Sequence, residues 1–477
     1  MKKYSKNEQE SACTTIMVGS KMMADGSRIY ARSDDAKENK ATTLMYYPHE
    51  ENGPTEFEAF DSPFYCDDLP KVRLAYSALE RPYLPGHWGE AGFNELGVGM
   101  SATETIFSNE KVLAIDPYVE SGVAENSIFN IVLPYIDSAR NGVKRLGALI
   151  EKYGSAEGFG IAFMDQKETW YLENAGGHRW LACRMPEDKY FVSGNQSRYR
   201  KYEPKDKHNY LASKDLIEFA VKNGLCAEDN FDFHTAYSLE SNNDKTYNYP
   251  RVWALQKLFT PSVKTNVKVN DYPVYQTADK LLTVTDIRNA FRYHYDGTQH
   301  DPYLHSNPKE PYRPVSIFRT INTHILQVRP WLPKEIGCLD YMAMGMADLG
   351  LFLPLYQGVT DYPEPYMIGE TYSTSDSAYW TFRKVMVLGM MDYNNCAPII
   401  KEVYGQLERE NDQRQAEMEI EFQRLYDNNQ PIRAMEMLQE FSDKLLMHAL
   451  DVSKDLLEIL FTKLTSKIGQ EYRFHGA

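Results

Sequence analysis

A cysteine near the start of the chain has the residue context of a nucleophile that carries its own base. Cys13 opens a β-rich run, CTTIMVG, and follows a polar segment, residues 1–12, with no evident folding role. Cleavage of the Ala12–Cys13 bond would give Cys13 both a thiol and a free α-amine, which titrates at about 7.7 to 8.0. Such an amine can take the thiol proton near neutral pH. The alternative interpretation is a buried strand cysteine behind a frayed terminus.

The residues after Cys13 predict a β-hairpin that would hold this thiol. The turn signal Asp25-Gly26 follows the first run, and residues 27–35, SRIYARSDD, form a second β-type run. A hairpin here would place the side chains of residues 32–35 beside the start of the first strand.

The remaining chain alternates strands and helices in blocks. Residues 127–153 carry apolar side chains at helical spacing, and Pro134 and Gly142 suggest two helices there. Residues 260–315 show little periodicity, which is typical of long surface loops. Further short β-type runs occur at 95–105, 158–171 and 180–192.

The C-terminal part is strongly helical. The pattern from 397 to 464, interrupted at Asn429 to Pro431, predicts two antiparallel helices. Their apolar stripe must cover the main domain or another subunit, which leaves a homo-oligomer open. The stripe comprises Met435, Leu438, Phe441, Leu445, Leu446 and Ala449.

Composition and charge exclude several classes of protein. The 477 residues have a formal net charge of −15, which argues against a dedicated nucleic-acid binder. No segment reaches the roughly 18 apolar residues of a membrane helix, so we expect no membrane partner. The polar N-terminus does not resemble a signal peptide, so we expect a cytoplasmic protein with reduced cysteines.

Common cofactor and hydrolase motifs are missing from the sequence. It contains no phosphate-binding P-loop, no Gly-x-Ser-x-Gly elbow and no His-Glu-x-x-His zinc motif. His300 and His305 flank Asp301, but further ligands are lacking nearby. We therefore expect no metal and no cofactor.

Five blocks in sequence order resemble the dipeptidase A and secernin family of cysteine N-terminal-nucleophile (Ntn) hydrolases, which is related to bile salt hydrolase and penicillin V acylase. The resemblance spans Cys13 to about Ala347. The blocks are ACTTIMVG with ADGSRIYARSDD, NELGV through SATET, LPYIDSARNGVKRLGALIEKYGSAEG, WYLENAGGHRWLACRMPEDKYFVSGNQ and RPVSIFRTINTHILQVRP.

The resemblance implies a set of catalytic residues. Cys13 falls at the family's nucleophile, and Arg32 and Asp35 match an arginine and an aspartate beside it, with Asp34 as the alternative acid. A guanidinium near the sulfur favours thiolate, and a carboxylate near the α-ammonium orients it. Asn195 matches the asparagine that donates an N–H to the oxyanion.

The resemblance also implies two groups that bind substrate. The late arginine of the site aligns best with Arg319, with Arg313 as the alternative. Where the acylases carry an oxyanion asparagine, this chain has Glu104, and an ionised carboxylate cannot donate a hydrogen bond. Our hypothesis is that Glu104 binds the α-ammonium of a dipeptide while Arg319 or Arg313 pairs with its carboxylate. The alternative is a solvated strand-end glutamate.

The family implies an α+β fold, a four-layer αββα Ntn-hydrolase sandwich with a C-terminal helical extension. We expect a propeptide at 1–12, a catalytic domain at 13–396 and a helical region at 397–477. The expected function is hydrolysis of dipeptides by an N-terminal cysteine that autocatalytic cleavage exposes. The alternatives are hydrolysis of an N-acyl or bile-acid-conjugated amide by the same mechanism, and an unprocessed, secernin-like interaction protein.

Self-processing can be tested on the intact mass of the protein. Wild-type protein is expected to lose residues 1–12, whereas Cys13→Ala, expressed identically, is expected to retain them because it lacks the attacking sulfur. If both proteins retained the segment, maturation would need another protease or Cys13 would be a structural thiol.

Overall fold

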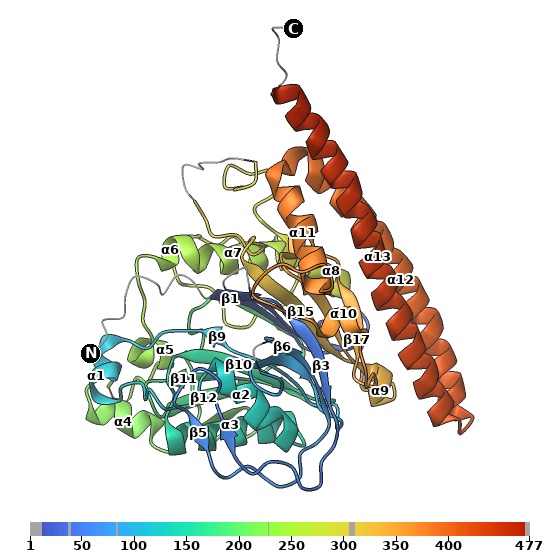
Figure 1. Ribbon diagram of the computed structural model, residues 1–477. Helices are drawn as coiled ribbons and strands as arrows, with labels where there is room; N and C mark the ends of the chain where they lie inside the picture. Colours follow the sequence, from blue (N-terminus) through green and yellow to red (C-terminus); the bar gives the residue numbers. More distant parts are fainter. Residues whose placement is uncertain (1–11, 37–39, 83, 228, 305–310, 473–477) are drawn as a thin grey trace.

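A computed structural model describes residues 12–36, 40–82, 84–227, 229–304 and 311–472 (Figure 1). The expected propeptide, apart from Ala12, and His305 lie outside the described residues. The architecture is mixed α+β and contains two large antiparallel sheets.

The first sheet holds the Cys13 hairpin between other strands. Its antiparallel order is β13-β1-β2-β15-β16-β17. The pairing of β1 with β2 confirms the predicted hairpin. All residues of β1, β2 and β15 are buried, so this part of the sheet is covered on both faces. The strands are β1 (Ala12–Val18), β2 (Arg28–Asp35), β13 (Tyr190–Ser193), β15 (Thr320–Val328), β16 (Cys338–Met344) and β17 (Leu353–Tyr356).

The second sheet has the order β14-β12-β11-β10-β8-β7-β6-β3, with β9 paired to β10. The predicted run at 180–192 divides between the sheets, because β12 belongs to the second and β13 to the first. β4 (Phe57–Glu58) and β5 (Tyr65–Cys66) pair with each other in a separate two-stranded antiparallel sheet. The strands of the second sheet are β3 (Thr43–Tyr47), β6 (Tyr76–Glu80), β7 (Gly89–Phe93), β8 (Gly99–Ser101), β9 (Glu104–Thr105), β10 (Phe159–Met164), β11 (Thr169–Ala175), β12 (Arg179–Arg184) and β14 (Tyr210–Ala212).

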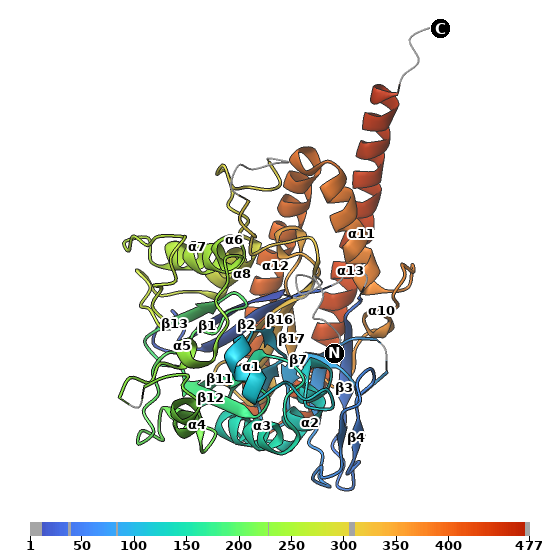
Figure 2. The same ribbon diagram turned by 90° about the vertical axis from the view of Figure 1, so that its left-hand side faces the viewer.

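The two sheets share one layer of side chains. Met17 and Tyr30 of the first sheet pack with Tyr171 and Phe93 of the second. Because side chains alternate along a strand, Cys13 and Arg32 point into this layer as Met17 and Tyr30 do. Figure 2 shows the two sheets one above the other. The alternation therefore places the thiol between the sheets.

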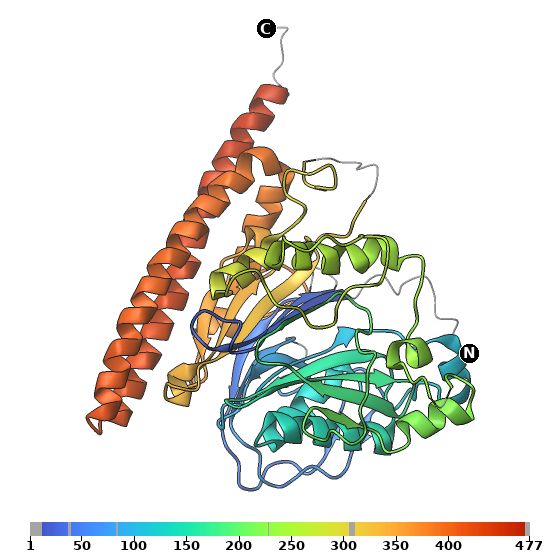
Figure 3. The same cartoon turned by 180° about the vertical axis from the view of Figure 1, so that it is seen from behind.

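Helices cover the outer faces of both sheets. α2 (Glu125–Val132) and α3 (Ala139–Tyr153) pack on the second sheet. On the opposite face of the first sheet, α7 (Tyr249–Phe259) packs on β13, α8 (Val284–Arg292) on β15 and α11 (Ala378–Met391) on β16; Figure 3 shows this side of the molecule. The shorter helices are α1 (Glu110–Ile115), α4 (Leu216–Lys222), α5 (Phe233–Tyr237), α6 (Asp244–Tyr247), α9 (Lys334–Gly337) and α10 (Glu364–Met367), with 3₁₀ turns at Leu133–Tyr135 and Ala347–Leu349.

The expected pair of helices at 127–153 is confirmed, with the break between them at Pro134. The chain leaves the helix at the 3₁₀ turn around Pro134, and Ser138 then caps α3. Gly142 lies inside α3. A glycine is needed there because a Cβ atom would come within 2.5 Å of Phe163 on the sheet. The glycine thus serves close packing rather than helix termination.

The region 260–315 contains a helix that the sequence prediction treated as loop. Thr283 and Asp286 form a capping box at the start of α8, and Ile287 and Phe291 bury its apolar face. A Thr-x-x-Asp motif ahead of an apolar pattern is a recognisable start signal. The many polar residues around this motif make the signal hard to distinguish in the sequence.

The two predicted C-terminal helices are confirmed and are longer than expected. α12 (Tyr393–Asp427) and α13 (Pro431–Glu471) run side by side (Figure 1). The predicted stripe packs within its own chain: Leu438, Leu445, Leu446 and Ala449 are buried, and Met435 and Phe441 are half-buried against the same core. In the described part of the chain, none of the helices combines the length and the apolar character needed to span a bilayer.

The packing of α13 predicts an asymmetric response to mutation. Leu446→Ala should lower the free energy of unfolding by about 2–5 kcal/mol, because Leu446 is 1% exposed in the core. Ile432→Ala should change it by no more than about 0.5 kcal/mol, because Ile432 on the same helix is 76% exposed. Urea unfolding of both variants measures the difference. Equal effects would contradict the packing of α13 on its own chain.

Candidate active site

Cys13 lies buried at the start of β1 with a guanidinium against its sulfur. Arg32 Nη1 is 2.9 Å from Cys13 Sγ and also donates to the Thr103 carbonyl at 2.7 Å. Asp34 Oδ1 lies 4.0 Å from the sulfur. All six cysteines are free, as expected for reduced thiols. The predicted pair of Cys13 and Arg32 is therefore brought together.

The surroundings of the thiol set its protonation. Burial raises the pKa of Cys13 well above its usual value, while Arg32 lowers it and the carboxylates of Asp34, Glu125 and Asp35 raise it. Together these effects raise the pKa of Cys13, so the thiol is protonated at neutral pH. The sulfur thus needs a base before it can attack a carbonyl, and this requirement fits the proposed α-amine.

The hairpin register places the two candidate aspartates on opposite faces of the sheet. Asp34 is opposite Cys13 and shares the layer that holds the sulfur. Burial acts to raise the pKa of Asp34, yet Arg81 and Arg32 lower it to about 2. Asp35 is opposite Ala12 and faces the helices, where Thr320 Oγ1 donates to it at 2.5 Å. Asp34 is therefore the acid beside the sulfur, and Asp35 is the acid beside the Ala12 position.

Asn195 holds the backbone nitrogen of Cys13. Its Oδ1 accepts from Cys13 N at 3.1 Å and from Arg251 Nη2 at 2.8 Å, and its Nδ2 donates to the Thr105 carbonyl at 3.0 Å. An arginine can only donate and a carbonyl can only accept, so both neighbours fix the orientation of the amide. The left-handed φ of 65° at Asn195 is one that asparagine tolerates better than most residues.

Glu104 lies behind Asn195. Its Oε1 accepts from Asn195 N at 2.5 Å and its Oε2 accepts from the Tyr171 hydroxyl at 3.0 Å. The residue is fully buried, which raises the pKa of its carboxyl. Glu104 is thus not the solvated strand-end glutamate considered as an alternative. Through the hydrogen bond from Asn195 N, Glu104 helps to hold Asn195 in place. Its contact with a substrate ammonium stays a prediction.

Arg251 on α7 is a site residue that the sequence analysis missed. Its Nη1 donates to the Cys13 carbonyl at 2.6 Å, and its Nη2 donates to the Gly194 carbonyl at 2.7 Å. Burial, followed by the charge of Arg313, lowers the pKa of Arg251 to about 9. Nothing in the local sequence distinguishes this arginine from a surface helix residue, because its contacts come from segments about 57 and 238 positions away.

The two candidates for the late arginine both contact Tyr247, Arg319 at its hydroxyl and Arg313 at its ring. Arg313 forms an ion pair with Asp35. Arg319 donates to the Tyr247 hydroxyl and is partly exposed. The guanidinium carbons of Arg313 and Arg251 lie 5.2 and 5.1 Å from the Tyr247 ring centroid. Arg313 is therefore already paired with Asp35, and Arg319 is the candidate with access to solvent.

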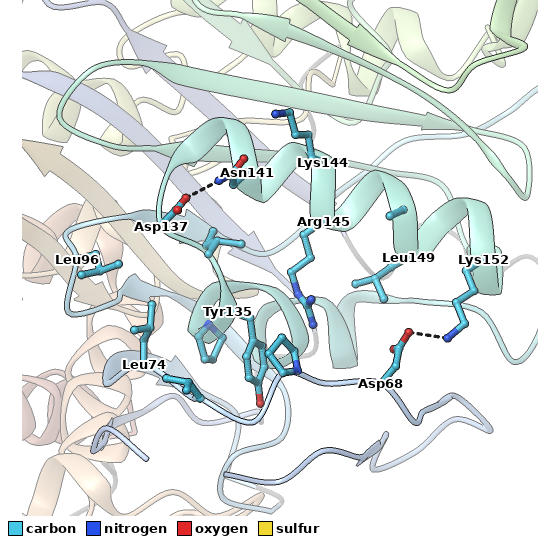
Figure 4. A pocket seen from close by; sticks show the side chains of 15 residues that line it. Asp68, Leu74, Leu96, Tyr135, Asp137, Asn141, Lys144, Arg145, Leu149 and Lys152 are labelled. Carbon is cyan, nitrogen blue, oxygen red and sulfur yellow. Dashed lines mark hydrogen bonds and ion pairs between the residues drawn. The ribbon is translucent and has the colours of Figure 1, made fainter. Parts of the chain in front are cut away.

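Two other kinds of site were considered, a metal site and a surface pocket. Among the described residues no group of three or more His, Cys, Asp or Glu is arranged to hold a metal. A pocket of about 650 Å³ lies beside α3 and is lined by Leu74, Leu96, Tyr135 and Arg145, among others (Figure 4). No cysteine lines that pocket, so we place the chemistry at Cys13.

Comparisons with known proteins identify the family of this chain. The model of peptidase family C69 matches residues 12–405, a range that begins one residue before Cys13. A "Probable dipeptidase" of Salmonella dublin is 49% identical over 356 residues, covering 74% of this chain and 82% of the relative. "Dipeptidase A" of Lactobacillus helveticus is 33% identical over 410 residues, covering 84% and 85%.

A further sequence relative and a solved structure complete the comparison. "Probable dipeptidase A" of Streptococcus pyogenes serotype M3 is 36% identical over 80% of this chain and 84% of the relative. Penicillin V acylase from Agrobacterium tumefaciens overlaps 72% of this chain and 86% of its own, with a TM-score of 0.30 and 12% identity. The match of the family model over most of the chain and the identity to these sequence relatives lead to one assignment: the chain belongs to peptidase family C69.

Proposed function

We propose that this chain is a dipeptidase whose nucleophile is Cys13, exposed as a new N-terminus by autocatalytic cleavage after Ala12. One observation carries the proposal: the buried Arg32 contacts the Cys13 sulfur while Asn195 Oδ1 holds the Cys13 nitrogen. A residue held at both its sulfur and its nitrogen is what a nucleophile with its own amine base requires. The sequence relatives named as dipeptidases support the same reaction.

The proposed fold is the four-layer αββα sandwich of Ntn hydrolases, with a C-terminal helical extension. Its support is the order of layers: α2 and α3 outside the second sheet, and α7, α8 and α11 outside the first. The division into a segment at 1–12, a catalytic domain at 13–396 and a helical region at 397–477 is part of this proposal. Autoprocessing and a cytoplasmic location are proposed with it.

Maturation begins with attack of the Cys13 sulfur on the Ala12 carbonyl carbon. The Ala12–Cys13 amide breaks, a thioester forms, and the nitrogen of Cys13 leaves as an amine that takes up the thiol proton. Water then hydrolyses the thioester, which releases residues 1–12 with a terminal carboxylate and restores the thiol. Arg251, which donates to the Cys13 carbonyl, holds the chain on the other side of the nucleophile.

Turnover repeats these steps on a dipeptide. The α-amine accepts the thiol proton as the sulfur attacks, and it then protonates the leaving amine. Asn195 Nδ2 carries two hydrogens and gives one to Thr105, so the second can serve the oxyanion as expected from the family. Arg32 Nη2 is buried and has no hydrogen-bond partner among the described residues, so it can serve as a second donor. Water hydrolyses the acyl-enzyme thioester and frees the N-terminal amino acid.

A clamp on both ends of the substrate would limit hydrolysis to dipeptides. Arg319 is the proposed partner of the substrate carboxylate, since Arg313 is already paired with Asp35. Glu104 can take the substrate ammonium only in addition to its two present donors. Glu125 is a second candidate for that end, because its carboxylate is partly exposed and lies 3.8 Å from Arg32 Nη1.

The clamp predicts a strict preference for unblocked dipeptides. N-acetylation or C-terminal amidation should lower kcat/KM about ten- to a hundred-fold, because a charged hydrogen bond contributes about 1.5–3 kcal/mol. Parallel assays of free dipeptides, blocked dipeptides and N-acylated amino acids measure this. Faster hydrolysis of N-acyl or bile-acid conjugates would favour the alternative amide hydrolase. Retention of residues 1–12 together with no hydrolysis of any substrate would favour the unprocessed interaction protein.

Arg251 predicts a defect in both maturation and turnover. Arg251→Lys keeps the charge but cannot reproduce the bonds to the Cys13 and Gly194 carbonyls, so loss of residues 1–12 and kcat should each fall at least about tenfold. Arg288→Lys is the matched control, because Arg288 is equally buried but pairs with Asp412. Wild-type rates in Arg251→Lys would contradict the assigned role.

A further inference from the structure

Seven polar residues form a ring behind the Cys13 thiol, joined by six hydrogen bonds and closed by the ion pair of Arg32 with Asp34 at 3.8 Å. They come from strands of both sheets and the residue after β6, and each is at most 1% exposed. Such a group is costly to bury unless every member is satisfied. The members are Arg32, Ser101, His324, Asn322, Glu90, Arg81 and Asp34.

One arm of the ring runs from the guanidinium at the thiol to β15. Arg32 Nε donates to Ser101 Oγ at 3.0 Å, and Ser101 Oγ lies 2.8 Å from His324 Nε2. His324 Nδ1 lies 2.9 Å from Asn322 Oδ1. Three contacts thus connect Arg32 with Asn322 through His324.

The other arm returns to the thiol through two carboxylates. Asn322 Nδ2 donates to Glu90 Oε2 at 2.7 Å, and Arg81 Nε donates to Glu90 Oε1. Arg81 Nη2 donates to Asp34 Oδ2 at 2.9 Å. Asp34 and Arg32 then meet at the Cys13 sulfur, where the ring closes.

The donors and acceptors of the ring specify one form of His324. Asn322 turns its Nδ2 to Glu90 and to Thr42 Oγ1, so its Oδ1 faces the imidazole and Nδ1 must carry the proton. Nε2 then accepts from the Ser101 hydroxyl, whose other contact, the Ala102 carbonyl, is longer at 3.4 Å. Because the Ser101 hydroxyl donates its hydrogen to His324, its oxygen is free to accept the hydrogen bond from Arg32 Nε.

The charges around the ring agree with a neutral imidazole. Burial, followed by the charge of Arg32, holds the pKa of His324 well below its usual range. Burial also raises the pKa of Glu90 while Arg81 opposes this, and the two donors aimed at Glu90 favour its ionised form. Arg32 and Arg81 are then balanced by Asp34 and Glu90.

We propose that His324 is a positioning residue for the nucleophile: in its neutral Nδ1–H form it fixes Ser101, and through Ser101 the face that Arg32 presents to the Cys13 sulfur. Arg32 Nε can bond Ser101 while Nη1 reaches the sulfur only in one orientation of the planar guanidinium. The inference rests on the proposed function in one respect, that Cys13 is the nucleophile.

Three variants test this role. Ser101→Ala removes one hydroxyl, His324→Asn can imitate Nδ1 but not reach Ser101, and His324→Gln can imitate the acceptor at Nε2. The readout is the rate at which iodoacetamide alkylates Cys13 of processed protein between pH 6 and 10, with the site confirmed by mass spectrometry. The charged groups that shape the titration of this thiol are Arg32, Asp34 and Glu125, together with Asp35 on the opposite face of β2.

Loss of the Arg32 orientation should raise the apparent pKa of the thiol, because Arg32 lowers it in the wild type. Ser101→Ala and His324→Asn should shift it upward by about one unit, which slows alkylation at pH 7 about tenfold. Their kcat should fall while KM stays within about twofold, and the double variant should be no worse than either single one. His324→Gln should recover most of the rate.

Specific outcomes would overturn the proposal. It fails if folded Ser101→Ala keeps the wild-type alkylation profile and kcat, or if its effect simply adds to that of His324→Asn. If His324→Asn does not fold, Ser101→Ala decides alone. His294→Gln is the control for altering a buried histidine, since His294 contacts Asp301 and not the ring. Dipeptidase activity in Cys13→Ala would refute the proposed function, while the alkylation profile would still test the ring.

Discussion

The contact between the Arg32 guanidinium and the Cys13 sulfur is the constraint on which the rest of the site depends. A permanent charge with no exposed surface must be balanced and bonded within the protein, because an unpaired buried ion costs several kcal/mol. Asp34, the Thr103 carbonyl and Ser101 meet part of this need. Each of them is itself buried and needs further partners. The polar ring between the sheets is the result of satisfying this one cation.

The same constraint explains why both sheets are needed for a site that one hairpin seems to supply. Cys13, Arg32 and Asp34 come from β1 and β2, but Ser101, Thr103 and Glu90 come from the second sheet. Their bonds cross the layer between the sheets. The stacking of the sheets is therefore as much a polar as an apolar interaction near the thiol. Farther along the strands, Met17 and Tyr30 continue the layer with ordinary hydrophobic packing.

The sequence predicted well what is local in the chain. The hairpin, its turn, the helix break at Pro134 and the C-terminal helical pair follow from spacing and turn residues that lie close together. Gly142 lies inside the second of the helices at 127–153 rather than at the break between them, and the reason for that glycine is Phe163 on another element. The capping motif of Thr283 and Asp286 marks the start of α8, but the polar residues around it resemble a loop. Local patterns thus predicted elements better than their ends.

The site was predictable where the family resemblance supplied residues, and less so where contacts are long-range. Cys13 and Arg32 were brought together as expected. Arg251 reaches Cys13 across 238 positions and has no local signature. His324 lay in a block that contributed to the resemblance, yet nothing in the letters shows that its imidazole links two arms of a ring. The face on which each aspartate lies required the strand register.

The position of Cys13 within the first sheet has a consequence for how activation relates to folding. The ladder that holds this residue runs from Ala12 along β2, with Asp35, Asp34 and Ser33 as successive partners, and β13 joins from Thr15 onward. A chain end created at this point stays anchored by neighbours on both sides. Under the proposed cleavage, precursor and product can share one architecture, and activation would need no rearrangement of domains. The proposed activation is then a purely chemical event, whose irreversibility comes from a broken covalent bond rather than from a refolded protein.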